Sequence, residues 1–277
     1  MNNLLSKILC GIFIVLSVST AKGGVNSDTT HLLANINDNS SKSYTRTIVK
    51  EANIIYPSSM EAHRDESLDY IQKFSNKKRE YLIHTYQRGK KFFPKIAAVL
   101  KRYNLPQELK VLMALESAFN PYAVSGAGAV GYWQIMDDVA KEYGLHIPDQ
   151  KDAGNAKGKK KDDRTNFAKS TLVAAKYLHD RCKNLNNNLL LMVASYNWGI
   201  GNVWNAMKRC GKNSPDFWDI KKYLPSETKN YVMNFIALNV IFENYDKFVK
   251  NQLVFNPETI EIPVSENAGK INTSTTE

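Results

Sequence analysis

Glu116 is the residue in this sequence best suited to acid–base chemistry. It lies on the apolar stripe of a predicted helix, three residues after Met113 and four after Leu112. A carboxylate on an apolar stripe loses hydration, which favours its neutral form and raises its pKa. A carboxyl group that stays protonated near neutral pH can donate its proton to a leaving oxygen. The alternative is a solvated glutamate at the helix end, since most helical glutamates face water.

A loop of small residues follows this helix, from Ser125 to Gly131, and leads into Tyr132, Trp133 and Gln134. Its glycines allow backbone angles that other residues avoid, and small side chains let a bulky ligand approach the main chain. Flat aromatic rings beside an amide suit the binding of a sugar. The alternative is that the aromatic residues belong to the core beside a structural turn.

A second polar pair, Tyr196 and Asn197, follows the almost wholly apolar run LLLMVAS. A helix that is apolar all round is buried. Gly199 and Gly201 then stop the helix and let the chain turn. The two polar side chains are therefore expected at the mouth of a buried helix, where they can point into a cleft. A tyrosine–asparagine pair taken alone is more often structural.

Taken together and in order, these motifs resemble those of the soluble-type lytic transglycosylase domain: Glu116-Ser117, Ser125, Gly131-Tyr132-Trp133-Gln134 and Ser195-Tyr196-Asn197. The longer run ESAFNPYAVSGAGAVGYWQIM resembles the membrane-bound lytic murein transglycosylase D branch. The likeness extends from about residue 93 to residue 245, which is over half of the chain. Several ordered motifs at fitting spacing are far more specific than any one of them.

The resemblance implies a mainly α, lysozyme-like transglycosylase domain with an N-terminal helical extension. The implied activity is cleavage of the β-1,4 bond between N-acetylmuramic acid and N-acetylglucosamine in peptidoglycan, with formation of 1,6-anhydromuramic acid. Glu116 would act as the single general acid and base. It would protonate the leaving oxygen and then take the proton of the sugar's own C6 hydroxyl. No cofactor is implied.

The resemblance also implies roles for a set of candidate substrate-binding residues: Ser117, Ser125, Tyr132, Trp133, Gln134, Met136, Tyr196, Asn197 and Tyr231. Ser125 and Gln134 would hydrogen-bond the muramic residue, and Met136 with Trp133 would line an apolar wall. The two tyrosines 196 and 231, with Asn197, would position the acid and the sugar, and Ser117 would orient its loop. Tyr132 and Ser195 depart from the branch, which usually has leucine and alanine at these positions.

Two other readings stay open. A goose-type-lysozyme-like muramidase would use the same fold and cut the same bond with water. Such an enzyme needs a second acid to hold the water, and the only weak candidate is Glu227, which helix capping explains adequately. A non-catalytic peptidoglycan-binding protein would keep the groove, but such a protein has no use for a buried acid.

The net charge indicates an anionic partner, and the N-terminal segment indicates an exported protein. The chain has 277 residues, 43% of them hydrophobic, and a net charge of +10. A basic surface suits nucleic acid, membrane or cell-wall polymer, but no nucleic-acid-binding motif is present. Lys7, the apolar run 8–18 and the residues around Ala21 predict a cleaved signal peptide, with an uncleaved anchor as the alternative. We expect a monomer in the periplasm or cell envelope, with outer-membrane association as a further option.

Apolar residues at helical intervals predict the surrounding elements. Helices are expected over 61–103 with a stop at Gly89, over 166–183, 189–196, 203–209, and over 231–245 after a cap at Ser226. The predicted organisation is a signal peptide (1–21), a flexible linker (22–60), the helical extension (61–103), the catalytic domain (104–250) and a flexible tail (251–277). A strand around 48–55 is an alternative within the linker. The Gly/Lys-rich segment 150–161 is interpreted as a solvated insertion.

The cysteines and histidines carry little chemistry of their own. Cys10 lies within the apolar run, where neighbouring residues argue against lipidation. Cys182 and Cys210 remain after cleavage and could pair in an oxidising compartment, with two buried thiols as the alternative. The five histidines are dispersed and show no paired spacing, so no metal site is predicted.

Overall fold

The computed structural model describes residues 28–34, 44–148 and 161–264. The predicted signal peptide, Cys10 and almost all of the Gly/Lys-rich segment lie outside these residues. The chain divides into two compact units. The larger one comprises residues 55–251, and the smaller one comprises the described residues before and after it. Within the described residues, no helix is long and apolar enough to cross a membrane.

The smaller unit is a three-stranded antiparallel sheet in the order β1-β2-β3. Its strands are β1 (Asp28–Ala34), β2 (Tyr44–Lys50) and β3 (Glu258–Val264). Beside the sheet, Asn53 joins the two chain segments, because its backbone N–H donates to the carbonyl of Val254 at 3.0 Å and its side-chain oxygen accepts from the N–H of Val254 at 3.0 Å. These strands lie in ranges that we interpreted as a linker and a tail, and only 48–50 of the alternative strand fall within β2.

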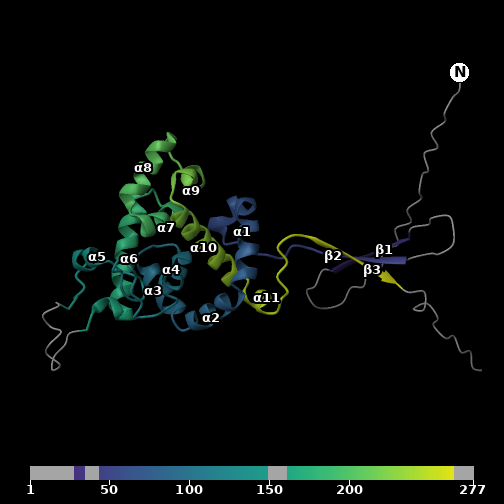
Figure 1. Ribbon diagram of the computed structural model, residues 1–277, viewed down its shortest axis with the longest axis horizontal. Helices are drawn as coiled ribbons and strands as arrows, with labels where there is room; N and C mark the ends of the chain where they lie inside the picture. Colours follow the sequence, from purple (N-terminus) through teal and green to yellow (C-terminus); the bar gives the residue numbers. More distant parts are fainter. Residues whose placement is uncertain (1–27, 35–43, 149–160, 265–277) are drawn as a thin grey trace, which may run out of the picture. The chain divides into compact units, whose positions relative to one another are not determined.

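The larger unit is helical, in agreement with the predicted mainly α fold (Figure 1). Its α-helices are α1 (Arg64–Lys77), α2 (Arg79–Gly89), α3 (Phe93–Arg102), α4 (Leu112–Ser117), α5 (Asp137–Glu142), α6 (Phe167–Asn184), α7 (Leu189–Trp198), α8 (Ile200–Cys210), α9 (Phe217–Ile220), α10 (Ser226–Glu243) and α11 (Tyr245–Val249). Short 3-10 turns are η1 (Ser58–His63), η2 (Gln107–Val111), η4 (Asp163–Thr165) and η5 (Lys221–Tyr223).

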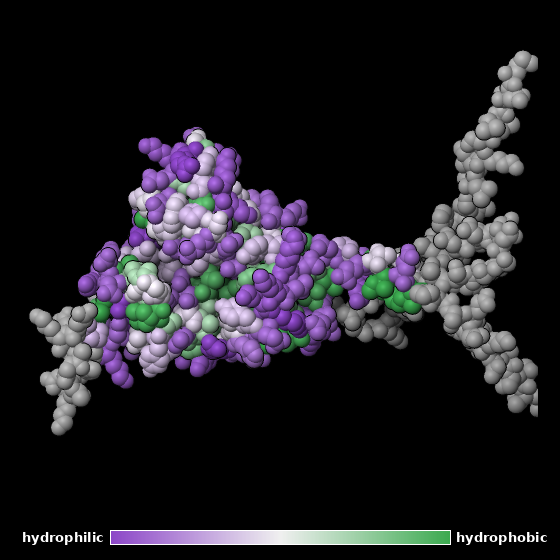
Figure 2. Space-filling model, in the orientation of Figure 1, coloured by the Kyte–Doolittle hydropathy of each residue, from purple (hydrophilic) through white to green (hydrophobic). Residues whose placement is uncertain are grey.

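Two helices, α7 and α10, form the centre of the core. The apolar run of α7 is buried from Leu189 to Ser195, and α10 buries residues on every side. Figure 1 shows α10 passing between α1 and α7, both of which it contacts. On the visible face of this unit, hydrophobic residues gather only in small scattered patches (Figure 2). The buried pair therefore supplies the rigid frame that positions Tyr196 and Asn197 on α7 and Tyr231 on α10.

Side-chain caps define where several helices begin. Asn166 accepts a hydrogen bond from the N–H of Lys169 at the start of α6, and Asn188 accepts one from the N–H of Leu191 at the start of α7. Ser226 was expected to cap α10, but it is the first helical residue and Pro225 holds the cap position without a side-chain bond. The fixed φ of proline sets the chain direction there in place of a capping oxygen.

Candidate active site

Glu116 lies in the last turn of α4, a helix of only six residues. Immediately after it, Ala118 and Phe119 have φ of 48° and 64°, in the left-handed region that is strained for side chains other than glycine. Phe119 is nevertheless buried, and its ring stacks on Phe92 with centroids 5.2 Å apart. This packing holds the strained turn and fixes where α4 ends. It thereby fixes the position of Glu116 in the last turn of that helix.

The carboxyl group of Glu116 accepts a hydrogen bond at Oε1 from the hydroxyl of Tyr231, on α10. Burial raises the pKa of Glu116 to about 7, although the Tyr231 bond acts in the opposite direction. Oε2 forms no hydrogen bond with any described residue. The group is therefore partly protonated near neutral pH, and its unbonded oxygen is the one available to exchange a proton with a ligand.

Tyr196 and Tyr231 surround this carboxyl with two hydroxyl groups. The Tyr196 hydroxyl donates to the carbonyl of Trp133 at 2.7 Å. Burial first, and then the nearby Glu116, raise the pKa of both tyrosines well above the ordinary value. Both hydroxyls therefore keep their protons across the physiological range, and they act as fixed donors that hold the site in place.

The loop after α4 is folded on itself by its own polar groups. The Ser117 hydroxyl donates to the carbonyl of Tyr132 at 2.8 Å, which ties the end of α4 to the far side of the loop. The Ser125 hydroxyl accepts from the N–H of Ala129 at 3.0 Å. Isolated bridges pair Val130 with Val124 and with Ile135, so the loop has a defined, strand-like path.

Two residues of the motif Gly131-Tyr132-Trp133-Gln134 have structural roles within the fold. Gln134 donates through Nε2 to the carbonyls of Ala123 and Gly131, both at 3.0 Å, so its amide nitrogen is engaged within the loop. Trp133 was expected to line an apolar wall, but it is 1% exposed and donates to Thr171 at 3.0 Å. The indole lies in the core, as the alternative interpretation held. Burying its large apolar surface is more favourable than leaving that surface in contact with water.

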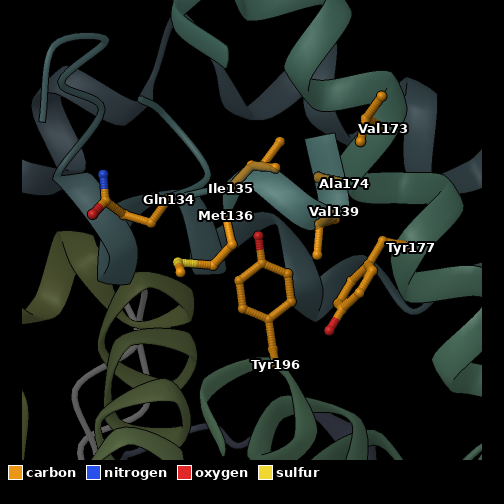
Figure 3. A pocket seen from close by; sticks show the side chains of 8 residues that line it. All are labelled: Gln134, Ile135, Met136, Val139, Val173, Ala174, Tyr177 and Tyr196. Carbon is orange, nitrogen blue, oxygen red and sulfur yellow. The ribbon is translucent and has the colours of Figure 1, made fainter. Parts of the chain in front are cut away.

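A small apolar cleft adjoins the site (Figure 3). Met136, which is 43% exposed, and Ile135 line it from the loop, and Val173 and Tyr177 line it from α6. Figure 3 shows the Tyr196 ring between Met136 and Tyr177, with its hydroxyl directed toward the loop. Sequence reasoning missed Tyr177, whose only signal is its helical spacing from Val173 and its place in the same predicted helix.

Asn197 lies between the two central helices. Its side-chain oxygen accepts from the hydroxyl of Thr228 at 2.8 Å, which joins the end of α7 to the first turns of α10. Glu227, the residue before Thr228, is exposed and makes no hydrogen bond to any described residue. The structure thus gives Asn197 a fixed partner, and it gives the weak second-acid candidate a solvated position.

Arg164 is a further residue that sequence reasoning missed. Its guanidinium is buried and donates to Asp162, to Asp137 and, at 3.3 Å, to the carbonyl of Ile135. The loop lies directly against its backbone, because a Cβ atom at Gly131 would come within 2.2 Å of the Arg164 carbonyl oxygen. No spacing rule in the sequence connects residues 131–137 with 162–164, so the contact could not be foreseen.

Cys182 and Cys210 do not form a disulfide in the described structure. The Cys182 thiol donates to the side-chain oxygen of Asn187 at 3.0 Å, and the Cys210 thiol lies 3.9 Å from the carbonyl of Asp219. The two thiols thus have separate partners on different elements. Among the residues that the structure describes, no group of histidine, cysteine and acidic side chains could hold a metal ion.

Comparison with known proteins confirms the resemblance seen in the motifs. Residues 94–218 match the family described as Transglycosylase SLT domain. Over 186 residues the chain is 35% identical to the membrane-bound lytic murein transglycosylase D of Escherichia coli (strain K12), a match that covers 66% of this chain and 38% of that protein. It is 34% identical over 127 residues to the membrane-bound lytic murein transglycosylase C of Histophilus somni (strain 2336), covering 43% and 34% of the two chains.

A solved structure with a similar helical region is the 70-kDa soluble lytic transglycosylase in complex with bulgecin A. It is 21% identical to this chain, with a TM-score of 0.46, and the match covers 72% of this chain and 32% of the other. The chain thus spans less than two fifths of the length of these relatives.

Proposed function

From the match of residues 94–218 to the family described as Transglycosylase SLT domain, we propose that the protein is a lytic transglycosylase of bacterial peptidoglycan. The bond cleaved is the β-1,4 linkage between N-acetylmuramic acid and N-acetylglucosamine, and the product ends in 1,6-anhydromuramic acid. The observation that carries this proposal is the single desolvated carboxyl of Glu116, with a pKa of about 7, at the start of the run ESAFNPYAVSGAGAVGYWQIM.

One carboxyl serves both halves of the reaction. Neutral Glu116 donates its proton to the glycosidic oxygen as the C1–O bond breaks, so the N-acetylglucosamine side leaves as an alcohol. The acetamido group of the muramic residue assists in place of a protein nucleophile. Ionised Glu116 then takes the proton of the C6 hydroxyl, and O6 closes on C1. The carboxyl ends protonated as it began, and no water is consumed.

The surroundings of Glu116 favour this cycle over hydrolysis with two acids. Ordinary glycosidases pair one carboxyl that donates a proton with another that acts as base or nucleophile. The pKa of Glu116 responds to burial and to Tyr231, and no other described carboxylate contributes to it. Glu227, the other candidate acid, is exposed to solvent. Among the described residues, none therefore takes the role of the second acid that a goose-type-lysozyme-like hydrolase needs beside Glu116.

The remaining candidates take supporting roles in the proposal. Tyr231 and Tyr196 hold the carboxyl and the loop through their hydroxyls. Ser125 and the side-chain oxygen of Gln134 would hydrogen-bond the muramic residue, while Met136 supplies an exposed apolar wall. Asn197 keeps the two central helices at a fixed spacing. The partner is the glycan strand of peptidoglycan, and nucleic acid is not one.

The place of action follows from the substrate. We propose that the chain is exported and works as a monomer in the periplasm or cell envelope, where its basic net charge of +10 favours an anionic polymer. Association with the outer membrane would fit relatives that are described as membrane-bound.

Mass spectrometry of the products from purified sacculi tests the proposal. Muropeptides that end in 1,6-anhydromuramic acid are expected from the wild-type protein and not from Glu116→Gln. Products heavier by one water, with a reducing end, would instead make the protein a hydrolase. Binding to sacculi without any product would make it a wall-binding protein.

A further inference from the structure

A second cavity lies between α2, α3, η2 and α10, and none of the candidate catalytic residues lines it. Its volume is about 340 Å³, within the range of about 300–1,000 Å³ that is typical of small-molecule sites. Tyr86, Phe93 and Phe242 supply an aromatic lining, while Lys90 and Lys110 add positive charge. This mixture is that of a site for a polar, charged ligand with an apolar body.

The charged groups at this cavity have no salt-bridge partners among the described residues. Neither Lys90 nor Lys110 forms an ion pair with any described residue, and the same holds for Glu243, which also lines the cavity. Two ammonium groups and one carboxylate therefore line one concave site without forming a salt bridge to any described residue. A ligand with carboxylates and one amine would match all three.

The polar and aromatic groups of the cavity are held in place. The rings of Tyr86 and Tyr245 stack with centroids 3.6 Å apart, and the Lys90 ammonium lies 5.7 Å and 6.0 Å from these centroids. Asn239 is buried and donates to the carbonyl of Phe235 at 3.0 Å, while its side-chain oxygen accepts nothing from the described residues. Preorganised groups of this kind reduce the entropy lost when a ligand binds.

We propose that this cavity binds the stem peptide of peptidoglycan, an inference that rests on the proposed function for the identity of the polymer. Stem peptides carry several carboxylates and, where they contain a diamino acid, one free amine. The two lysines would bind carboxylates, Glu243 would bind the amine, and the aromatic lining would cover the aliphatic part of the peptide.

The cavity and the candidate acid share two structural elements. Asn239 follows Tyr231 by eight residues on α10, which corresponds to about 12 Å along a helix. Lys110 lies in η2, which runs directly into α4 and Glu116. The cavity and the candidate acid are therefore carried by the same two parts of the chain, α10 and the η2–α4 segment.

Calorimetric titration of the Glu116→Gln protein with sugar-free stem peptide tests this site without any turnover. Saturable binding is expected, and Lys90→Ala/Lys110→Ala should weaken it at least tenfold. The matched control is Lys95→Ala/Lys101→Ala, which removes the same charge from exposed positions of α3 and should bind normally. Absence of binding, or equal loss in both double variants, would overturn the proposal.

Acetylation of the peptide's free amine supplies a second, independent arm. The acetylated peptide should bind the parent protein several-fold more weakly, whereas a Glu243→Gln variant should bind both peptides alike. If acetylation has the same effect in both proteins, Glu243 does not read the amine and the proposed match fails. Because none of these titrations needs catalysis, they can succeed even where the product analysis of sacculi excludes a transglycosylase.

Discussion

The two central helices, α7 and α10, and the loop that follows α4 are stabilised in different ways. In α7 and α10 the backbone is regular, and stability comes from side chains buried on every side. Between residues 118 and 136 the chain adopts positive φ at Ala118, Phe119 and Gln134, and hydrogen bonds from serine and glutamine side chains replace regular structure. The candidate acid lies where the two kinds of structure meet, with Tyr231 reaching it from α10.

The difference separates what keeps the protein folded from what makes it reactive. A regular helix has unstrained backbone angles, whereas a strained loop persists only where many surrounding contacts hold it in place. Here those contacts are the Phe92–Phe119 stack and the Arg164 network. We therefore expect core substitutions to change stability, and substitutions at the loop and the acid to change activity, pH dependence or both.

The largest effect is expected from Glu116→Gln. The amide keeps the shape of the side chain but has no transferable proton, so turnover of sacculi should fall by about 10²–10⁴-fold. Release of muropeptides measured by chromatography would show the loss, and circular dichroism would show the fold unchanged. A variant with near-wild-type turnover would remove Glu116 from the role of acid.

A core substitution should have the reverse outcome. Phe235 is wholly buried in α10, and Phe235→Ala should lower the free energy of unfolding by about 3–5 kcal/mol. At a temperature where the variant remains folded, its kcat should match that of the wild type. Asn205→Ala, at an exposed position of α8, serves as the control with no effect on either quantity. A large fall in kcat for the folded variant would show that the core and the active loop do not act independently.

The acid should also make the stability of the whole protein depend on pH. The pKa of Glu116 is about 7 in the folded protein, against an ordinary value of 4.5. At a pH between these two values the folded protein keeps a proton on Glu116 that the unfolded chain releases. Stability should therefore fall as pH rises through this window, by roughly 3 kcal/mol in total. Below the window both states are protonated and the contribution is complete.

Urea denaturation of the wild type and of Glu116→Gln across the window measures this contribution. Because glutamine does not titrate, the variant should gain stability relative to the wild type as pH rises. A difference between the two proteins that stays constant with pH would show that Glu116 is not desolvated.

A substitution at Gly131 tests whether the loop after α4 is held against the backbone of Arg164. Gly131→Ala should destabilise the protein by about 2 kcal/mol or more, because φ is +84° and the new Cβ would meet the Arg164 carbonyl. Gly126→Ala, five residues earlier, meets no atom within 4 Å and should be neutral. Thermal unfolding of the two variants gives the comparison, and equal melting temperatures would mean that the loop is not held against Arg164.

The smallest expected effect is a shift in pH dependence from Tyr231→Phe. The Tyr231 hydroxyl lowers the pKa of Glu116, so its removal should raise that pKa further. The alkaline limb of kcat/KM, which reports loss of the acid's proton, should move to higher pH. Tyr81→Phe, on α2, is the control and should leave the profile in place. A shift to lower pH would mean that the hydroxyl favours the neutral acid.

The helical frame could be predicted closely from the sequence. The predicted ranges 166–183 and 189–196 correspond to α6 and α7 within two residues at each end, because asparagine caps and apolar runs are local signals. Glu116 could be singled out for a related reason, since an acid on an apolar stripe is visible in a single helix turn.

The loop and the sheet could not be predicted in the same way. The predicted helix that carries Glu116 is divided into η2 and α4, and the direction of the Trp133 ring depends on Thr171, which is 38 residues away. Likewise, β2 pairs with β3 across more than 200 residues. Such partners are chosen by packing in three dimensions, for which local periodicity holds no signal.

The register of the small sheet has a mechanical consequence. Asp28 begins β1 opposite Lys50, whereas Val264 ends β3 opposite Tyr44, so the chain enters and leaves the sheet at its opposite ends. Tension between these two points would pull along the strands and load the perpendicular ladder bonds together, in shear. The helical unit is inserted between β2 and β3 and would carry none of this force until the sheet yields.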